Sequence, residues 1–493
     1  MQIELDRSSA QPLYQQLASI IQQRIRNGSF PPGMRLPTVR QLAEQLGITR
    51  LTVHSAYAEL ASGGWVEATV GRGTFVAELD HALRMPPLSQ LDHEVTPRGV
   101  LHDILRMAHI PGLCTLAMSD PAPEWYPMRE WQRALDETLT LYGASVMSYA
   151  TGQGDSELRA VLAYHLHDRG FTVGPDEIMI TNGVTQALSI AANVLACPGD
   201  TVLVEQPTYL GMINTLITQG YKPIGLPLDE EGLLPDALEH AIIQHKPAFL
   251  YTIPNFHNPT GVCLSPQRRH AVLEIAQRHN LTIVEDDIYG RLSLEGSPPP
   301  SLKAEDFTGK VIHLGGFSKS LMPGLRVGYM VAPPSFLRQA VTVRQAQDLC
   351  SPLFVQRALA NFISHGWHTA HIRRVLPRYR ERRDTLLRAM EQHFPAGVFW
   401  TRPKGGFACW VTLPNSISVT EVYLAAIERG IAFAPGEVFC ATPSNRSELR
   451  LSFSTPSPSN INNAVAILGE LLRERSHRRN ISIPASNDCL PIV

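Results

Sequence analysis

The chain has 493 residues, of which 44% are hydrophobic and 18% charged, and its formal net charge is -2. A single hydrophobic core rarely extends over so many residues, so at least two domains are expected. The balanced charge excludes a basic field over the whole molecule, and any contact with nucleic acid must therefore depend on a local surface.

The ends and the cysteines indicate the compartment. Residues 1–9 lack the apolar run of a signal peptide, and no apolar stretch has the length of a membrane span. Seven cysteines are scattered without a CxxC pair, which argues against a disulfide framework and against a zinc site. We therefore expect a protein of the reducing cytoplasm with no membrane partner and no metal.

The N-terminal residues carry helical periodicity. Apolar residues at helical spacing predict a first helix that ends at Asn27-Gly28. Thr38 and Gln41 have the spacing of a capping box, which predicts a helix over 39–46 that ends at Gly47.

A third helix and a hairpin follow. Thr49 can cap the third helix, which would bury the face that carries Val53, Ala56, Tyr57 and Leu60. After two glycines, the segments 65–70 and 74–76 flank a glycine turn and are typical of two short strands. Helix, helix-turn-helix and hairpin together predict a mostly α winged helix-turn-helix domain over residues 1–79.

The composition changes twice more along the chain. Residues 80–109 contain several prolines and little periodicity, which predicts a linker. In residues 110–474, β-branched apolar runs alternate with amphipathic stretches, as in an α/β fold with a largely parallel sheet. The polar segment 475–493, interrupted by Pro484 and Pro491, is predicted to be a disordered tail.

Lys319 has an unusual setting among the six lysines. It follows an apolar run over 311–314, stands three residues after Gly316, and precedes Arg326 by seven residues. A lysine that forms an imine with an aldehyde cofactor needs close backbone approach and a nearby cation to hold a phosphate. Arg326 can supply that cation through a bidentate contact.

Four further motifs favour the same chemistry. Each places a polar or aromatic group, or a helix start, just after a predicted strand. An aromatic ring could stack on a heterocycle, an amide could bond a phenolic oxygen, and a buried carboxylate could pair with a protonated pyridine nitrogen. The motifs are Gly183-Val184-Thr185, Pro207-Thr208-Tyr209, Asn255-Phe256-His257-Asn258 and Glu285-Asp286-Asp287-Ile288-Tyr289.

These motifs, in this order, resemble the fold-type I aminotransferases, which bind pyridoxal 5'-phosphate in an α/β fold with large and small subdomains. The resemblance implies that Lys319 forms the internal aldimine and that Asp286 pairs with the pyridine nitrogen. It further implies that Tyr289 and Asn258 flank the ring oxygen and that Tyr209 stacks on the ring. The phosphate would be held by Arg326, Val184 and Thr185. Arg450 would bind the carboxylate of a substrate. Tyr149 resembles the tyrosine that reaches into the neighbouring subunit, which implies a homodimer. Many relatives carry Ser or Thr where this chain has Gly316, and Ser318 is the candidate substitute.

Residues 10–77 resemble the GntR family of winged helix regulators. The matching stretches are 36–43, 46–53, 56–60 and 71–76. The resemblance implies that this domain binds double-stranded DNA. Arg40 and Thr52 would contact phosphates, Arg50 a base edge in the major groove, and Arg72 the minor groove, while His54 stands where relatives often have Arg.

A GntR module joined to an aminotransferase-like domain is the arrangement of the MocR (GabR-like) transcriptional regulators, and the chain resembles them. The resemblance implies a regulator, associated with the nucleoid when bound to its operator, that senses an amino acid or amine through Lys319. Two alternatives remain open. A catalytically active aminotransferase could retain the DNA-binding module, because the residues for transamination are all present, and a regulator of vitamin B6 supply could sense the cofactor alone.

Overall fold

In the computed structural model, the structure describes residues 12–26, 30–31, 33–62, 65–69, 73–77, 113–443 and 446–480. The chain divides into two compact units, Met1–Leu91 and Asp92–Val493. The predicted linker, residues 80–109, lies outside the described residues.

The N-terminal unit is the predicted winged helix-turn-helix. Its three helices precede a two-stranded antiparallel hairpin. The elements are α1 Leu13–Arg26, α2 Val39–Leu46, α3 Arg50–Ser62, β1 Val66–Thr69 and β2 Gly73–Val76.

The predicted caps of α2 and the predicted start of α3 are confirmed, whereas Asn27-Gly28, the predicted end of the first helix, lies outside the described residues. The Thr38 hydroxyl accepts a hydrogen bond from the Gln41 amide N–H at 3.3 Å, and the Gln41 side chain accepts one from the Thr38 amide at 3.1 Å. Gly47 ends α2 with a φ of 61°, a backbone conformation that glycine adopts without strain. The Thr49 hydroxyl accepts a hydrogen bond from the Thr52 amide at the start of α3. The predicted inner face of α3 is buried, so its remaining residues are available at the surface.

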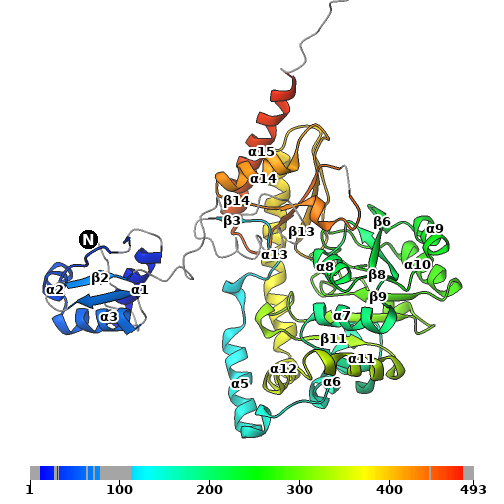
Figure 1. Ribbon diagram of the computed structural model, residues 1–493, viewed down its shortest axis with the longest axis horizontal. Coiled ribbons are helices and arrows are strands. Elements are labelled where there is room, and N and C mark those ends of the chain that lie inside the picture. Colours follow the sequence, from blue (N-terminus) through cyan, green and yellow to red (C-terminus); the bar gives the residue numbers. More distant parts are fainter. Residues whose placement is uncertain are drawn as a thin grey trace, which may run out of the picture. The chain divides into compact units, whose positions relative to one another are not determined.

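The second unit is built on an eight-stranded mixed sheet (Figure 1). Its central strands β10, β9, β8, β5 and β6 run parallel, whereas β4, β11 and β7 pair antiparallel. In spatial order the strands are β4 Ile178–Thr181, β11 Gly328–Val331, β10 Val311–Gly316, β9 Thr282–Asp286, β8 Phe249–Thr252, β5 Thr201–Gln206, β6 Lys222–Asp229 and β7 Gly232–Leu233.

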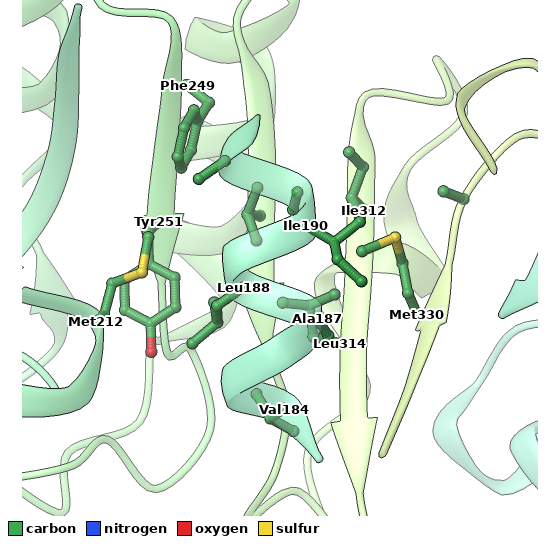
Figure 2. Close-up of a cluster of buried hydrophobic side chains, with 14 of the residues drawn as sticks. Val184, Ala187, Leu188, Ile190, Met212, Phe249, Tyr251, Ile312, Leu314 and Met330 are labelled. Atoms are coloured by element: carbon green, nitrogen blue, oxygen red, sulfur yellow. The ribbon is translucent and has the colours of Figure 1, made fainter. Parts of the chain in front are cut away.

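Helices connect these strands and extend the unit. The helices of the large subdomain are α5 Met128–Tyr142, α6 Ser156–His165, α7 Val184–Leu195, α8 Leu210–Thr218, α9 Pro235–His245, α10 Pro266–Arg278, α11 Pro334–Gln347 and α12 Leu353–Ser364. Helix α7 occupies the centre, where its apolar side chains contact the parallel strands. Figure 2 shows Leu188 on the side of Met212 and Tyr251, and Ile190 on the side of Ile312 and Met330. This core fixes the first turn of α7 relative to the ends of the strands.

A smaller subdomain follows the long helix α13 Trp367–His393, which packs against α15 Pro458–Asn480 (Figure 1). Its antiparallel sheet has the order β12 Phe399–Trp400, β13 Ala408–Thr412, β16 Glu448–Ser452 and β15 Ala434–Pro435. Helix α14 Val419–Glu428 packs on α15, and β14 Ile431–Ala432 pairs in parallel with β3 Cys114–Thr115. The subdomain therefore incorporates the first described segment of the second unit.

The prediction of a disordered tail from residue 475 is wrong for its first six residues. Helix α15 continues to Asn480 because Leu471 and Leu472 anchor its preceding turn, and residues such as Arg and Glu propagate a helix readily once it is nucleated. Residues 481–493 lie outside the described residues. Within the described part of the chain, each helix is too short or too polar to cross a lipid bilayer.

Candidate functional site

A cavity of about 210 Å³ in the second unit is lined by most of the residues that the sequence singled out. The carboxyl ends of parallel strands meet at one edge of a sheet, which is where α/β proteins bind ligands. Here Asp286 ends β9, while Tyr209, Asn258 and Lys319 follow the ends of β5, β8 and β10. The other predicted residues that line the cavity are Val184, Thr185, Tyr289, Ser318, Arg326 and Arg450.

The Lys319 amine makes an ion pair that the sequence did not predict. Its Nζ donates a hydrogen bond to Asp120 Oδ1 at 2.7 Å, and the two side chains are 22% and 30% exposed. Burial alone would lower the pKa of Lys319, but the neighbouring Tyr289 and Asp120 raise it above its ordinary range. Lys319 is therefore held as an ammonium in this arrangement.

Three consecutive acidic residues stand at the end of β9, whose last two residues are Glu285 and Asp286 and which Asp287 follows, and each has different partners. Glu285 accepts hydrogen bonds from Ser301 and the Leu302 amide and is paired with His313 at 3.0 Å. Asp287 is paired with Arg169 at 2.7 Å, and both of those side chains are 2% exposed.

Asp286 is buried without a cation among the described residues. It accepts hydrogen bonds from the Tyr251 hydroxyl at 2.9 Å and from the Ile288 amide at 3.2 Å. Burial raises the pKa of Asp286 to about 6, and the two hydrogen bonds offset only part of that effect. A carboxylate in this position favours a ligand that brings a positive charge.

The first turn of α7 and Arg326 form an anion cradle. Gly183 precedes the helix with a φ of 83°, and a Cβ on it would lie only 2.8 Å from Arg326 Nη2. Arg326 also has a positive φ of 50° and donates a hydrogen bond to the Asn182 carbonyl. The guanidinium is thereby fixed beside the free N–H groups of Val184 and Thr185, an arrangement that binds phosphate.

The departure at Gly316 has a packing reason. A Cβ there would lie 3.2 Å from Val184 and 3.3 Å from Ile288, so even a small side chain would crowd the cavity wall. Ser318, two residues later, lines the cavity. The hydroxyl available near the cradle from this segment is therefore that of Ser318.

Arg450 lines the cavity from β16 of the small subdomain. Its Nη1 donates to Asn258 Oδ1 at 2.8 Å, its Nη2 donates to the Ala117 carbonyl, and its guanidinium stacks 4.7 Å from the Phe439 ring centroid. Its Nε is buried and has no hydrogen-bond partner among the described residues. A guanidinium held in this way is able to bind a carboxylate, which is the role predicted for Arg450.

Tyr149 was predicted to act at the cofactor site but does not line this cavity. It is 84% exposed on the described unit, so its predicted role depends on a neighbouring subunit. The predicted minor-groove residue of the first unit, Arg72, lies outside the described residues. Among the described residues, His, Cys, Asp and Glu side chains form no group that could hold a metal ion.

Asp120 is the charged residue of the cavity that sequence reasoning missed. It stands in Ser119-Asp120-Pro121, a segment without periodicity that has the composition of an ordinary turn. Its partner lies 199 residues away along the chain, so the pair has no local signal.

Among the described residues of the first unit, those predicted to contact DNA lie on α2 and α3. Arg40 and Glu44 are paired at 3.1 Å, with both side chains more than half exposed. Arg50 and His54 are exposed on α3, and the Thr52 hydroxyl bonds to that of Thr49. These side chains reach the surface of the unit, where the predicted contacts with DNA are sterically allowed.

Comparison with known proteins identifies both units. Residues 13–76 match the gntR family of bacterial regulatory proteins, and residues 110–468 match the aminotransferase class I and II family. The HTH-type transcriptional regulator YdfD of Bacillus subtilis is 31% identical over 95% of this chain and 98% of its own. The chain belongs to the MocR-type regulators.

Other comparisons agree with this family. The HTH-type transcriptional regulator TauR of Rhodobacter capsulatus is 32% identical, covering 94% of this chain and 96% of TauR. The crystal structure of LysN, an alpha-aminoadipate aminotransferase of Thermus thermophilus complexed with N-(5'-phosphopyridoxyl)-L-leucine, superposes with a TM-score of 0.72 at 34% identity. It covers 77% of this chain and 95% of LysN. Membership of the aminotransferase class I and II family implies that this MocR-type chain depends on pyridoxal 5'-phosphate.

Proposed function

We propose that this chain is a transcriptional regulator that senses an amino acid or amine through pyridoxal 5'-phosphate bound at Lys319 and transmits the signal to an operator. The observation that carries the proposal is one cavity lined by an amine, an unpaired buried carboxylate and an arginine clamp, in a chain that begins with a GntR-type module. The reducing cytoplasm is the proposed compartment.

The residues present fit the cofactor. The cradle of α7 and Arg326 matches a phosphate, since a Cβ at Gly183 would fill it. Asp286, whose pKa is raised by burial, would be stabilised by a protonated pyridine nitrogen. Tyr209 would stack on the ring, and Tyr289 and Asn258 would flank its phenolic oxygen.

The protein's own side chains determine what such a site recognises. When bound, pyridoxal 5'-phosphate supplies an aldehyde that reacts with primary amines and a ring that withdraws electrons. Lys319 supplies the resident amine, which an incoming amine would displace. Arg450, with its spare donor, would select ligands that carry a carboxylate beside that amine.

Signalling requires that ligand binding favours one arrangement of the protein over another, and that this arrangement differs in operator affinity. Dimerisation, with Tyr149 completing the partner's site, would place two DNA-binding modules on two half-sites.

Operator affinity measured in three states tests this function. A duplex selected from a random-sequence pool by the cofactor-loaded protein serves as the probe, and fluorescence anisotropy gives its affinity at fixed salt. We expect affinity to differ between cofactor-free, cofactor-loaded and amine-loaded protein, and Lys319→Ala to abolish both the visible absorption band and these differences. Equal affinities in all three states would contradict the proposal.

A catalytically active aminotransferase is the second candidate, favoured by the complete set of Lys319, Asp286 and Arg450 in one cavity. Repeated conversion of an amino acid and a 2-oxo acid would support it. If pyridoxal 5'-phosphate alone changes operator affinity and no amine adds to the change, the ligand is the vitamin itself.

A further inference from the structure

The ion pair between Asp120 and Lys319 has a consequence for what happens after an amine binds. The carboxylate lies 2.7 Å from the Lys319 amine and lines the same cavity as Arg450 and Asp286. Asp120 has no other hydrogen-bond or ion-pair partner among the described residues, so the pair links these two side chains alone.

Amine exchange conserves protons. A ligand enters as R–NH₃⁺, its nitrogen replaces that of Lys319 in the covalent link to the cofactor, and Lys319 leaves as –NH₃⁺. Transamination then requires a base that takes the proton from the ligand's Cα. The released lysine can accept that proton only as a neutral amine with a free lone pair.

We infer that Asp120 captures the released Lys319 as an ammonium and thereby prevents it from removing the Cα proton, so that the bound amine persists as a signal. This inference rests on the proposed function, because it concerns the state that follows exchange at Lys319. It assigns Asp120 as a positioning residue that acts through Lys319 and makes the site a sensor in which turnover is suppressed.

The other groups that face Lys319 do not replace Asp120. The nearby phenols, Tyr289 and Tyr209, raise the pKa of Lys319 only through their ionised forms, and burial raises the pKa of the Tyr289 hydroxyl. Arg450 is a cation and opposes the ammonium. Among the described residues, Asp120 is therefore the carboxylate that can hold Lys319 as an ammonium.

The first test uses the cofactor-free full chain. Acetylation of Lys319 by acetic anhydride is followed by mass spectrometry against pH, with the exposed Lys246 as the reference for reagent. The acetylation rate is proportional to the fraction of Lys319 that is unprotonated. At a pH below the pKa of Lys319, lowering that pKa by one unit therefore raises the rate about tenfold. We expect Asp120→Asn to accelerate labelling at least tenfold by shifting the midpoint, with an unchanged plateau at high pH.

A matched control comes from the same segment. Glu124 is 51% exposed and accepts a hydrogen bond from Arg382 at 2.6 Å, so Glu124→Gln removes a neighbouring carboxylate without touching the pair. Its labelling profile should equal that of the unchanged protein, and Asp120→Glu should restore part of the suppression. A rise in the plateau alone in Asp120→Asn would show altered access and would overturn the inference.

The second test uses the cofactor-loaded protein. Each standard L-amino acid is incubated with it in D₂O, and NMR follows the exchange of the Cα hydrogen alongside 2-oxo acid formation. We expect little exchange in the unchanged protein and at least tenfold more in Asp120→Asn. Fast exchange in the unchanged protein, or none in either, would overturn the inference. A protein without a visible band would instead contradict the proposed function, while the acetylation test, which needs no cofactor, still decides whether Asp120 holds Lys319.

Discussion

Replacing Asp286 with Asn should stabilise the cofactor-free protein at alkaline pH. The side chain is 2% exposed and has two hydrogen-bond donors but no cation among the described residues. Burial raises its pKa from the ordinary 3.8 to about 6. Between these values the folded state binds more protons than the unfolded state, so stability falls as pH rises through this window and stays low above it.

The size of the effect follows from the shift. A difference of about 2 units corresponds to about 3 kcal/mol of destabilisation by the ionised carboxylate above pH 6. Asn removes that charge but keeps only one acceptor oxygen, so one of the donors from Tyr251 and Ile288 loses its partner at a cost of about 1 kcal/mol. The net gain of Asp286→Asn should be about 2 kcal/mol near pH 8, and it should disappear near pH 4.5, where the native carboxyl is already protonated.

Urea unfolding of the second unit at both pH values measures this difference in the free energy of unfolding. Asp287, the adjacent residue, provides a control for which the expected change has the opposite sign. Asp287 is paired with Arg169 at 2.7 Å in a fully buried site, so Asp287→Asn should destabilise by about 3–5 kcal/mol. With pyridoxal 5'-phosphate bound, the gain of Asp286→Asn should reverse into a loss, because the carboxylate then meets a cation. A destabilised Asp286→Asn at alkaline pH without cofactor would refute the reasoning.

Four further changes test other parts of the molecule. Gly183→Ala should weaken cofactor binding, measured by titration of the visible absorption band. The backbone of Gly183, with a φ of 83° and a ψ of 171°, is open almost only to glycine, and the new methyl would meet the Arg326 guanidinium. Backbone strain of this kind costs about 1–3 kcal/mol. Thr38→Ala should lower the stability of the N-terminal unit by about 1 kcal/mol in thermal unfolding, since it removes the hydroxyl that accepts a hydrogen bond from the Gln41 amide. Arg50→Ala should reduce the preference for the selected duplex over scrambled DNA by about 1–3 kcal/mol, with little change in binding to scrambled DNA. Arg450→Met should weaken the band shift produced by amino acids and leave that of amines without a carboxylate unchanged.

Local patterns predicted most of the fold. The capping box at Thr38 and the left-handed Gly47 are encoded within a few residues, so the boundaries of α2 follow from sequence alone. Strand ends were equally readable, because an apolar run followed by Lys319 or Asp286 places a functional group at a known edge of a parallel sheet. Patterns of this kind therefore identify many of the residues that line the cavity.

Contacts between distant segments could not be predicted. The Ala117 carbonyl meets Arg450 across 333 residues, and Asp120 meets Lys319 across 199. Both involve a segment that runs from β3 into a turn, where neither periodicity nor composition indicates a partner. Only the folded small subdomain, which takes β3 into its own structure by pairing it with β14, brings this segment to the cavity.

The charges of the cavity explain why such a site suits a sensor. The protein supplies cationic or protonatable partners for Glu285 and Asp287 but leaves Asp286 to hydrogen bonds, although burying it ionised costs about 3 kcal/mol. A cationic ring in the cavity, as proposed for pyridoxal 5'-phosphate, would balance that charge. Asp120 is paired with Lys319 and, under the proposed amine exchange, would regain that partner when an incoming amine displaces the lysine. Amine binding would then leave both carboxylates paired, and the base that could convert the amine would stay protonated.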